Sequence, residues 1–181
     1  LVVGLNYKGS WEEMREYRRR RLESLDYAER EAKYVYKQLR KRGYTPTILI
    51  SKDATVENVV NVLRESVAVF HFTGHGRYRT HRTGEKRGII CLHDADLYSA
   101  NIKECFRGKL GAPYLSFINA CESGKEIYSS EIPNAFISYG AENLISTLWS
   151  VYDKDSSKIT RKFYRNLVEG ETIGEALRTA R

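Results

Sequence analysis

Residues 69–76 read Val-Phe-His-Phe-Thr-Gly-His-Gly, and residues 115–124 read Leu-Ser-Phe-Ile-Asn-Ala-Cys-Glu-Ser-Gly. Each stretch begins with an apolar run that has the length and composition of a buried strand. Each then ends on one reactive side chain among small residues, His75 in the first and Cys121 in the second. Small residues let the backbone turn sharply and let a substrate chain approach closely. The two stretches therefore predict core strands with chemically reactive ends.

Strand-like and helix-like segments alternate along the rest of the chain. Strands are expected at 1–5, 47–50, 67–72, 88–92, 114–118 and 144–149, and helices at 26–43, 55–63, 132–140, 156–168 and 173–180. Residues 26–29, Asp-Tyr-Ala-Glu, resemble a capping box at the start of the first helix, and Thr55 can cap the second. Strands separated by helices are typical of βαβ units, which build a mostly parallel sheet covered on both faces. An α/β fold is therefore predicted, with the functional groups at the carboxyl ends of its strands.

Composition places the chain among ordinary globular domains. It has 181 residues, of which 41% are hydrophobic and 29% charged, and no linker or repeat divides it. The apolar runs are far shorter than the ~20 residues that a membrane span needs. Three irregularly spaced cysteines argue against a disulfide framework and favour a reducing, cytoplasmic location. Four histidines without a Cys-x-x-Cys motif make a structural zinc site unexpected.

Positive charge is concentrated in two places. The formal net charge is +7, and the excess lies in residues 15–21 and 77–87. Basic patches can hold phosphate backbones, so a nucleic-acid-binding module is one alternative. No stacking aromatic motif, helix-turn-helix pattern or zinc knuckle accompanies them. A solvated face or a protein docking surface is the favoured interpretation. For residues 77–87 we expect a hairpin tip, with an activation loop or an autolysis site as alternatives.

The two reactive side chains can act together if their strands are neighbours. Adjacent strands lie ~4.8 Å apart, so His75 and Cys121 would face each other. An imidazole can take the proton of a thiol and later protonate a leaving amine. The backbone N–H groups of Gly76 and Cys121 would then stabilise an oxyanion. The competing interpretation is that both side chains are structural. His71, which alternates with two phenylalanines, is interpreted as structural.

The segments His71–Gly76 and Asn119–Gly124 resemble the CHAT-domain branch of the caspase-like cysteine peptidases, clan CD. Caspases, separase, clostripain and gingipains belong to the same clan. Further likeness lies in residues 139–141, 146–153, 163–170 and 175–181. The resemblance is strong over residues 65–181 and looser over residues 1–64.

This resemblance implies a caspase-like three-layer sandwich, in which a mostly parallel six-stranded sheet carries helices on both faces. It implies a cysteine endopeptidase that cleaves a protein substrate, with Cys121 as nucleophile and His75 as acid and base. Gly76 and Cys121 would supply the oxyanion donors, and no metal or organic cofactor would be needed. A catalytically silent scaffold of the same fold is the alternative, although both catalytic residues are present.

CHAT domains usually lie behind sensing or scaffold regions, such as helical repeats or nucleotide-sensing modules. We therefore expect a regulatory region or sensor partner, no membrane association and at most an indirect contact with nucleic acid. The chain begins and ends inside periodic segments. Residues 1–181 are accordingly expected to be a single domain excised from a longer regulated protein.

The segment Leu148–Asp153 is expected to build part of the pocket for the residue before the scissile bond. Trp149 would offer a flat apolar wall there, and Asp153 a carboxylate. In separase-like relatives an acidic residue of the matching segment helps to hold a basic side chain. A carboxylate can pair strongly with Arg or Lys. The competing role for Asp153 is a cap for the helix expected from Ser156.

Overall fold

A parallel sheet forms the centre of the molecule. The computed structural model describes residues 1–80, 86–108, 111–120, 131–147 and 151–181, with only the backbone of Thr80 and Lys86. Every strand pair in this sheet is parallel. The strands follow the order β2 (Ile48–Ile50), β1 (Val2–Gly4), β3 (Val69–Gly74), β7 (Leu115–Ala120) and β8 (Asn143–Ser146).

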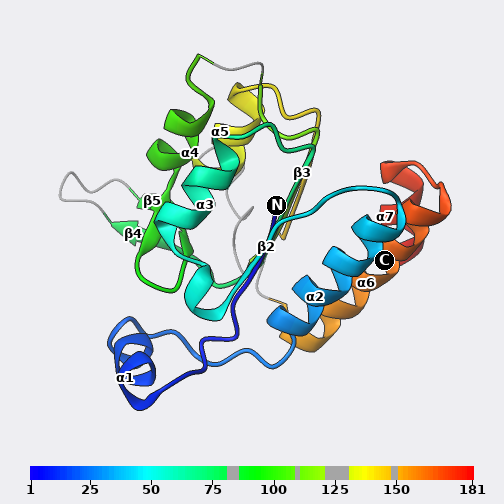
Figure 1. Cartoon of the computed structure of the whole chain (residues 1–181). Helices are drawn as coiled ribbons and strands as arrows, with labels where there is room; N and C mark the ends of the chain where they lie inside the picture. Colours follow the sequence, from blue (N-terminus) through cyan, green and yellow to red (C-terminus); the bar gives the residue numbers. More distant parts are fainter. Residues whose placement is uncertain (81–85, 109–110, 121–130, 148–150) are drawn as a thin grey trace.

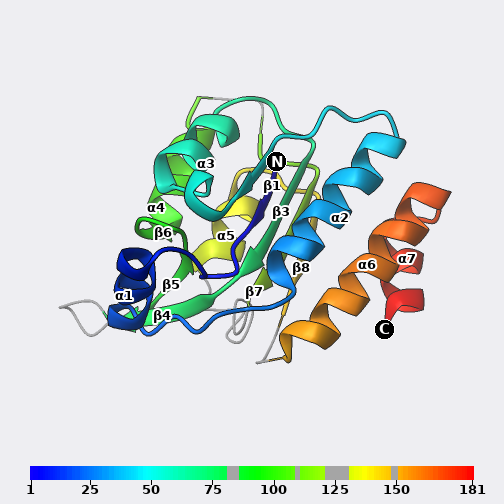
Figure 2. The same cartoon turned by 60° about the horizontal axis from the view of Figure 1, so that its bottom comes forward.

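Helices cover both faces of this sheet, as Figures 1 and 2 show. One face carries α2 (Ala28–Lys41), α6 (Asp153–Glu169) and α7 (Ile173–Ala180). The other carries α3 (Val56–Leu63), α4 (Ser99–Phe106) and α5 (Glu131–Ser138). A short 3-10 helix, η1 (Ser51–Asp53), precedes α3. The three-layer α/β sandwich is therefore confirmed.

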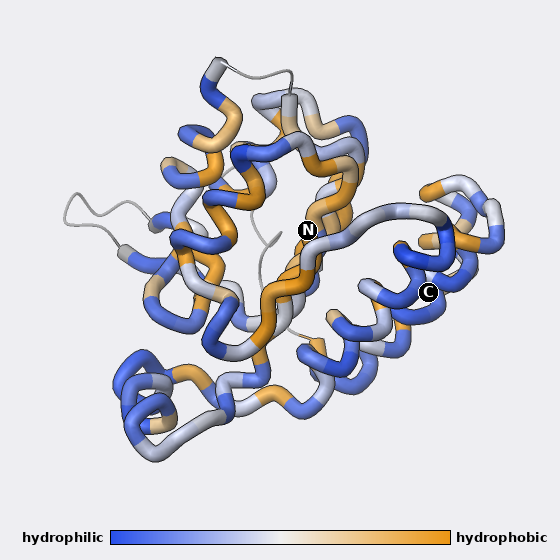
Figure 3. The backbone as a smooth tube through the Cα atoms, in the orientation of Figure 1, coloured by the Kyte–Doolittle hydropathy of each residue, from blue (hydrophilic) through white to orange (hydrophobic). Residues whose placement is uncertain are grey.

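The sheet separates two apolar cores, because successive side chains of a strand point to opposite faces. In β3, Phe70 and Phe72 belong to the core beneath α3, α4 and α5. Val69 belongs to the other core, beneath α2, α6 and α7. His71 faces that second core, where its ring lies 5.2 Å from the ring of Phe117. Figure 3 shows that hydrophobic residues are concentrated along the strands at the centre of the molecule.

A second, antiparallel sheet projects from the end of β3. It contains β4 (Gly76–Thr80), β5 (Lys86–Cys91) and β6 (Asp96–Tyr98), in that order. The expected strand at 88–92 is thus a hairpin arm outside the central sheet. Among the described residues the central sheet consequently has five strands, and the expectation of six needs correcting. The basic stretch 77–87 supplies most of β4 and the first two residues of β5, while the expected hairpin tip at residues 81–85 lies outside the described residues.

Helix α1 (Trp11–Arg19) was not expected from the sequence. It carries most of the first basic stretch, and Tyr17 is its only buried residue. Its apolar residues Trp11, Met14 and Tyr17 do recur at helical spacing, but they are few among charged side chains, and only Met14 and Tyr17 pack on the core. Its start did carry a signal: Ser10 and Glu13 form a capping box, in which the Ser10 N–H donates to Glu13 Oε2 at 2.7 Å.

The start of α2 also differs from the expectation. A capping box led by Asp26 was expected, but the helix begins at Ala28 without a side-chain cap from Tyr27. Asp26 instead pairs with Lys8 at 2.5 Å. The Tyr27 N–H donates to Asp153 Oδ2 at 2.7 Å, so a residue from α6 stabilises the start of α2. Other expected helices, including the Thr55-capped one, are confirmed within a few residues.

None of the helices in the described ranges combines the length and apolarity needed to cross a membrane.

Candidate active site

The ends of β3 and β7 lie side by side. Gly74 and Ala120, the last residues of the two strands, are register partners in a parallel pair. His75 follows Gly74 in the sequence, and Cys121 follows Ala120. The strand adjacency on which the predicted dyad depends is therefore present. Of the predicted site residues, Cys121 and Trp149 lie outside the described residues.

Three hydrogen bonds fix the backbone of His75. Its N–H donates to the Tyr7 hydroxyl at 2.8 Å, and that hydroxyl donates to the Cys91 carbonyl at 2.7 Å. The Cys91 N–H donates back to the His75 carbonyl at 2.9 Å. The buried Tyr7 hydroxyl thus completes the ladder between the start of β4 and the end of β5. Gly74 has to be small here, because an added Cβ would lie 2.8 Å from the Tyr7 hydroxyl.

The His75 imidazole has a defined hydrogen-bond partner. Its Nε2 lies 2.8 Å from the backbone oxygen of Glu23. A carbonyl oxygen can only accept, so Nε2 carries the hydrogen, and Nδ1 of the neutral ring carries the lone pair. Burial, with the Tyr7 ring 4.6 Å away, lowers the pKa of His75 below its ordinary value of 6.5. The ring is therefore neutral at neutral pH and equipped to act as a base.

The Gly76 amide is available on the side away from the hairpin. Gly76 pairs with Ile90 in the antiparallel ladder. The bond from the Cys91 N–H to the His75 carbonyl makes this a non-hydrogen-bonded pair. The Gly76 N–H consequently points away from β5. A backbone N–H that donates to a substrate oxygen must point in this way, because it cannot be used in the hairpin ladder.

Asp153 shares a small hollow with His75. The hollow, about 40 Å³ in volume, is also lined by Leu25, Asn119 and Ser156. Burial raises the pKa of Asp153, while hydrogen bonds from backbone N–H groups, including that of Tyr27, oppose the rise. The competing interpretation, that the Asp153 carboxylate caps its own helix, does not hold. Helix α6 already begins at Asp153, and the carboxylate accepts a hydrogen bond from the start of α2.

A larger, mainly apolar pocket adjoins this hollow. It has a volume of about 280 Å³ and shares Asn119, Val151 and Ser156 with it. Phe117, Ile145 and other apolar side chains supply most of its lining. The carboxyl end of the sheet therefore offers room for a side chain beside His75.

A buried polar cluster lies beneath the site. Asn119 Nδ2 donates to both carboxylate oxygens of Glu31, at 2.9 and 3.1 Å, and to Ser156 Oγ at 3.1 Å. His71 Nε2 lies 3.2 Å from Glu31 Oε1, and its Nδ1 lies 3.2 Å from the Tyr164 hydroxyl. The structural role predicted for His71 is consistent with this full burial. Glu31 and Asn119 were not singled out from the sequence.

The two described cysteines are buried thiols. Burial raises the pKa of Cys91 to about 12, which keeps its thiol protonated. The Cys105 thiol lies 3.1 Å from the carbonyl of Asn101, to which it donates. Neither environment generates a nucleophile.

Comparison with known proteins identifies the family. The CHAT domain family matches residues 8–181, nearly the whole chain. The chain belongs to the CHAT domain family. This family is related to the caspase-like cysteine peptidases of clan CD, so the expected relationship is confirmed.

Solved structures extend the comparison of the fold. This CHAT domain is similar to the crystal structure of protein GSU0716 from Geobacter sulfurreducens, with a TM-score of 0.64 and 15% sequence identity. The similarity covers 97% of this chain and 86% of the other. At this identity the likeness concerns the fold alone. The search of curated proteins found no match to this chain.

Proposed function

We propose that the chain is a cysteine endopeptidase domain in which Cys121 is the nucleophile and His75 the acid and base. The observation that carries the proposal is the pairing of Gly74 with Ala120. It makes His75 and Cys121 the next residues after two paired strand ends. The burial of Cys91 and Cys105 supports Cys121 as the one cysteine left to act as nucleophile.

The proposed reaction uses the hydrogen-bonding state of His75. The Cys121 thiol gives its proton to Nδ1, and the sulfur attacks the carbonyl carbon of the scissile bond. The Gly76 and Cys121 amides donate to the oxyanion that forms. The imidazolium protonates the leaving amine, which leaves a thioester. His75 then takes a proton from water, the hydroxide attacks the thioester, and the thiol is regenerated with release of the acid.

We also propose that the pocket for the residue before the scissile bond accepts Arg or Lys. Asp153 supports this role because its half-buried carboxylate lines the same hollow as His75. Trp149 is proposed as the apolar wall of the pocket. A regulatory region or sensor partner is proposed to control the activity, in a reducing cytoplasm that keeps the thiol available.

Nucleic-acid binding is the weaker alternative, because several arginines of the two basic stretches are already paired with acidic side chains. Arg20 and Arg79 both bind Asp96, at 2.8 and 2.7 Å. Arg19 binds Glu16 through two hydrogen bonds of 2.8 Å. Charges that are already paired contribute less to binding a phosphate backbone.

Asp153→Asn should selectively impair cleavage after basic residues. Asparagine keeps an oxygen acceptor for the Tyr27 N–H, so the start of α2 is preserved. Losing a charge-assisted pair with the substrate should lower kcat/KM about tenfold or more for Arg and Lys peptides. Matched peptides with Leu or Met before the cleaved bond should be cleaved as before.

The experiment is a peptide-library cleavage assay on the full-length protein with its regulatory region, comparing the parent and Asp153→Asn. An equal loss on all four peptides would remove Asp153 from the specificity pocket. If no peptide or protein is cleaved under any activating condition, the silent scaffold becomes the better account.

A further inference from the structure

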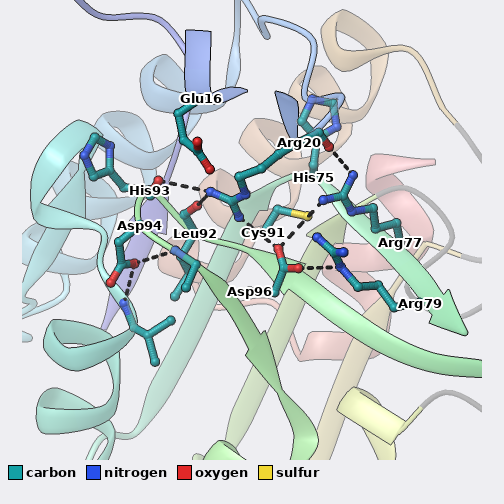
Figure 4. A network of polar contacts seen from close by, with 12 residues as sticks. Glu16, Arg20, His75, Arg77, Arg79, Cys91, Leu92, His93, Asp94 and Asp96 are labelled. Carbon is teal, nitrogen blue, oxygen red and sulfur yellow. Dashed lines mark hydrogen bonds and ion pairs between the residues drawn. The ribbon is translucent and has the colours of Figure 1, made fainter. Parts of the chain in front are cut away.

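Arg20, which follows the last residue of α1, is attached to the second sheet by its buried guanidinium (Figure 4). Only 8% of the residue is exposed. Nη1 donates to the carbonyl oxygens of Leu92 and His93, at 2.8 and 3.1 Å. Nη2 donates to Asp96 Oδ1 at 2.8 Å. The planar fork of arginine suits this set of three acceptors, which a lysine ammonium cannot reproduce.

The hairpin reinforces the same attachment. Arg79 Nε donates to Asp96 Oδ2 at 2.7 Å, and Arg77 Nη2 lies 3.9 Å from Asp96 Oδ1. Arg77 also donates to the backbone carbonyl of Arg20. Figure 4 shows Arg20, Arg77 and Arg79 directed at the one carboxylate of Asp96. Both the side chain and the backbone of Arg20 are therefore held by the second sheet.

Arg20 is also close in sequence to the group that holds the catalytic imidazole. Glu23, three residues later, supplies the carbonyl that accepts from His75 Nε2 at 2.8 Å. Between them Arg21 has a φ of 56°, a left-handed conformation that is uncommon for a residue other than glycine. Only Arg21 and Leu22 therefore separate the anchored Arg20 from Glu23.

We propose that Arg20 is a positioning residue for His75, because its contacts with the second sheet hold the Glu23 carbonyl against the imidazole. In this position the carbonyl keeps the hydrogen of the neutral ring on Nε2 and the lone pair on Nδ1. The catalytic consequence rests on the proposed peptidase function, in which Nδ1 takes the thiol proton. The positioning itself is a property of the folded chain and can be measured without substrate.

The experiment compares the parent with Arg20→Lys, Arg77→Met and the control Arg19→Lys. The control makes the same change in a neighbouring arginine whose side chain is 76% exposed. Nitrogen-15 NMR of the imidazole rings reports the tautomer of His75 in the full-length protein. His71, which is buried against α6 and Glu31, serves as the reference ring in every sample.

In the parent and in Arg19→Lys, His75 is expected to carry its hydrogen on Nε2. In Arg20→Lys the two tautomers should become mixed. If the protein cleaves peptides, kcat/KM should then fall about 10- to 100-fold while KM changes little, because the base is misoriented. A merely structural Arg20 would lower thermal stability and leave the His75 tautomer unchanged.

An unchanged tautomer in folded Arg20→Lys would overturn the positioning role. If Arg20→Lys does not fold, Arg77→Met decides, because it removes the donor to the Arg20 carbonyl at a partly exposed site. A mixture of His75 tautomers in Arg77→Met supports the proposal, and the same tautomer as in the parent overturns it. If the tautomers change as expected but the parent cleaves nothing, positioning stands and the peptidase proposal fails. If the parent cleaves peptides but neither variant changes the His75 tautomer, the peptidase proposal stands and the positioning role fails.

Discussion

Cys121→Ala is expected to lower kcat/KM for peptide cleavage on the order of 10⁴-fold or more, because no other group replaces the nucleophile. The assay uses the full-length protein under conditions in which the parent cleaves. Cys105→Ala is the matched control, since it also removes one thiol, from a buried position in α4. The control should retain cleavage, although the cavity it leaves lowers stability.

The partner residue offers an independent test of the same dyad. His75→Gln should cost about 10²- to 10⁴-fold, because glutamine can still donate to the Glu23 carbonyl but cannot take up a proton. In the parent, burial lowers the pKa of His75 below 6.5, and only the neutral ring is a base. Activity should therefore be lost on acidification through a pH below 6.5. A loss that sets in well above this value would contradict the assignment of the base.

Glu31→Ala is expected to destabilise the domain by about 1–3 kcal/mol, because it leaves the buried Asn119 amide without its carboxylate acceptor. The fully buried Glu31 carboxylate accepts both contacts from Asn119 and lies 3.2 Å from His71 Nε2. Without the carboxylate, the Asn119 amide is buried with fewer acceptors. The measurement is the free energy of unfolding from denaturant titration.

Two further variants serve as comparisons for the stability of Glu31→Ala. Glu31→Gln keeps an acceptor for Asn119 and should lose less stability than Glu31→Ala. Glu104→Ala, an exposed change in α4, should stay within about 0.5 kcal/mol of the parent. If Glu31→Ala were as mild as Glu104→Ala, the buried cluster would not be holding α2 to β3 and β7.

The sequence predicted the parts of the fold that depend on local pattern. Apolar runs marked the core strands, and the Thr55 cap marked the start of α3. The strand-end rule led to His75. The adjacency of the strands that end at Gly74 and Ala120 was only a condition of the predicted dyad, which the structure shows to be met. Periodicity locates the strands along the chain, whereas the order of strands in the sheet, β2-β1-β3-β7-β8, does not follow their order in the sequence.

The supporting contacts around His75 could not be predicted in this way. Tyr7 reaches the His75 N–H across 68 positions, and Arg20 reaches Asp96 across 76. Glu31 looked like one more charged residue on a helix, yet it is completely buried. Nothing in local composition shows that a charged side chain will find its partners far along the chain. The role of Asp153 was left open for the same reason. Its carboxylate accepts a hydrogen bond at the start of α2, although the residue itself belongs to α6.

Covalent labelling identifies the nucleophilic cysteine and measures how far His75 activates it. The reagent is a peptide ketone that carries a basic residue and a carboxylate leaving group, and it is added to the full-length, activated protein. Mass spectrometry then shows which of the three cysteines has been alkylated. We expect one adduct, on Cys121, which forms far more slowly in His75→Gln, while Cys91 and Cys105 stay unmodified. An adduct on Cys91 or Cys105 in the native protein, or undiminished labelling of Cys121 in His75→Gln, would contradict the proposed Cys–His dyad.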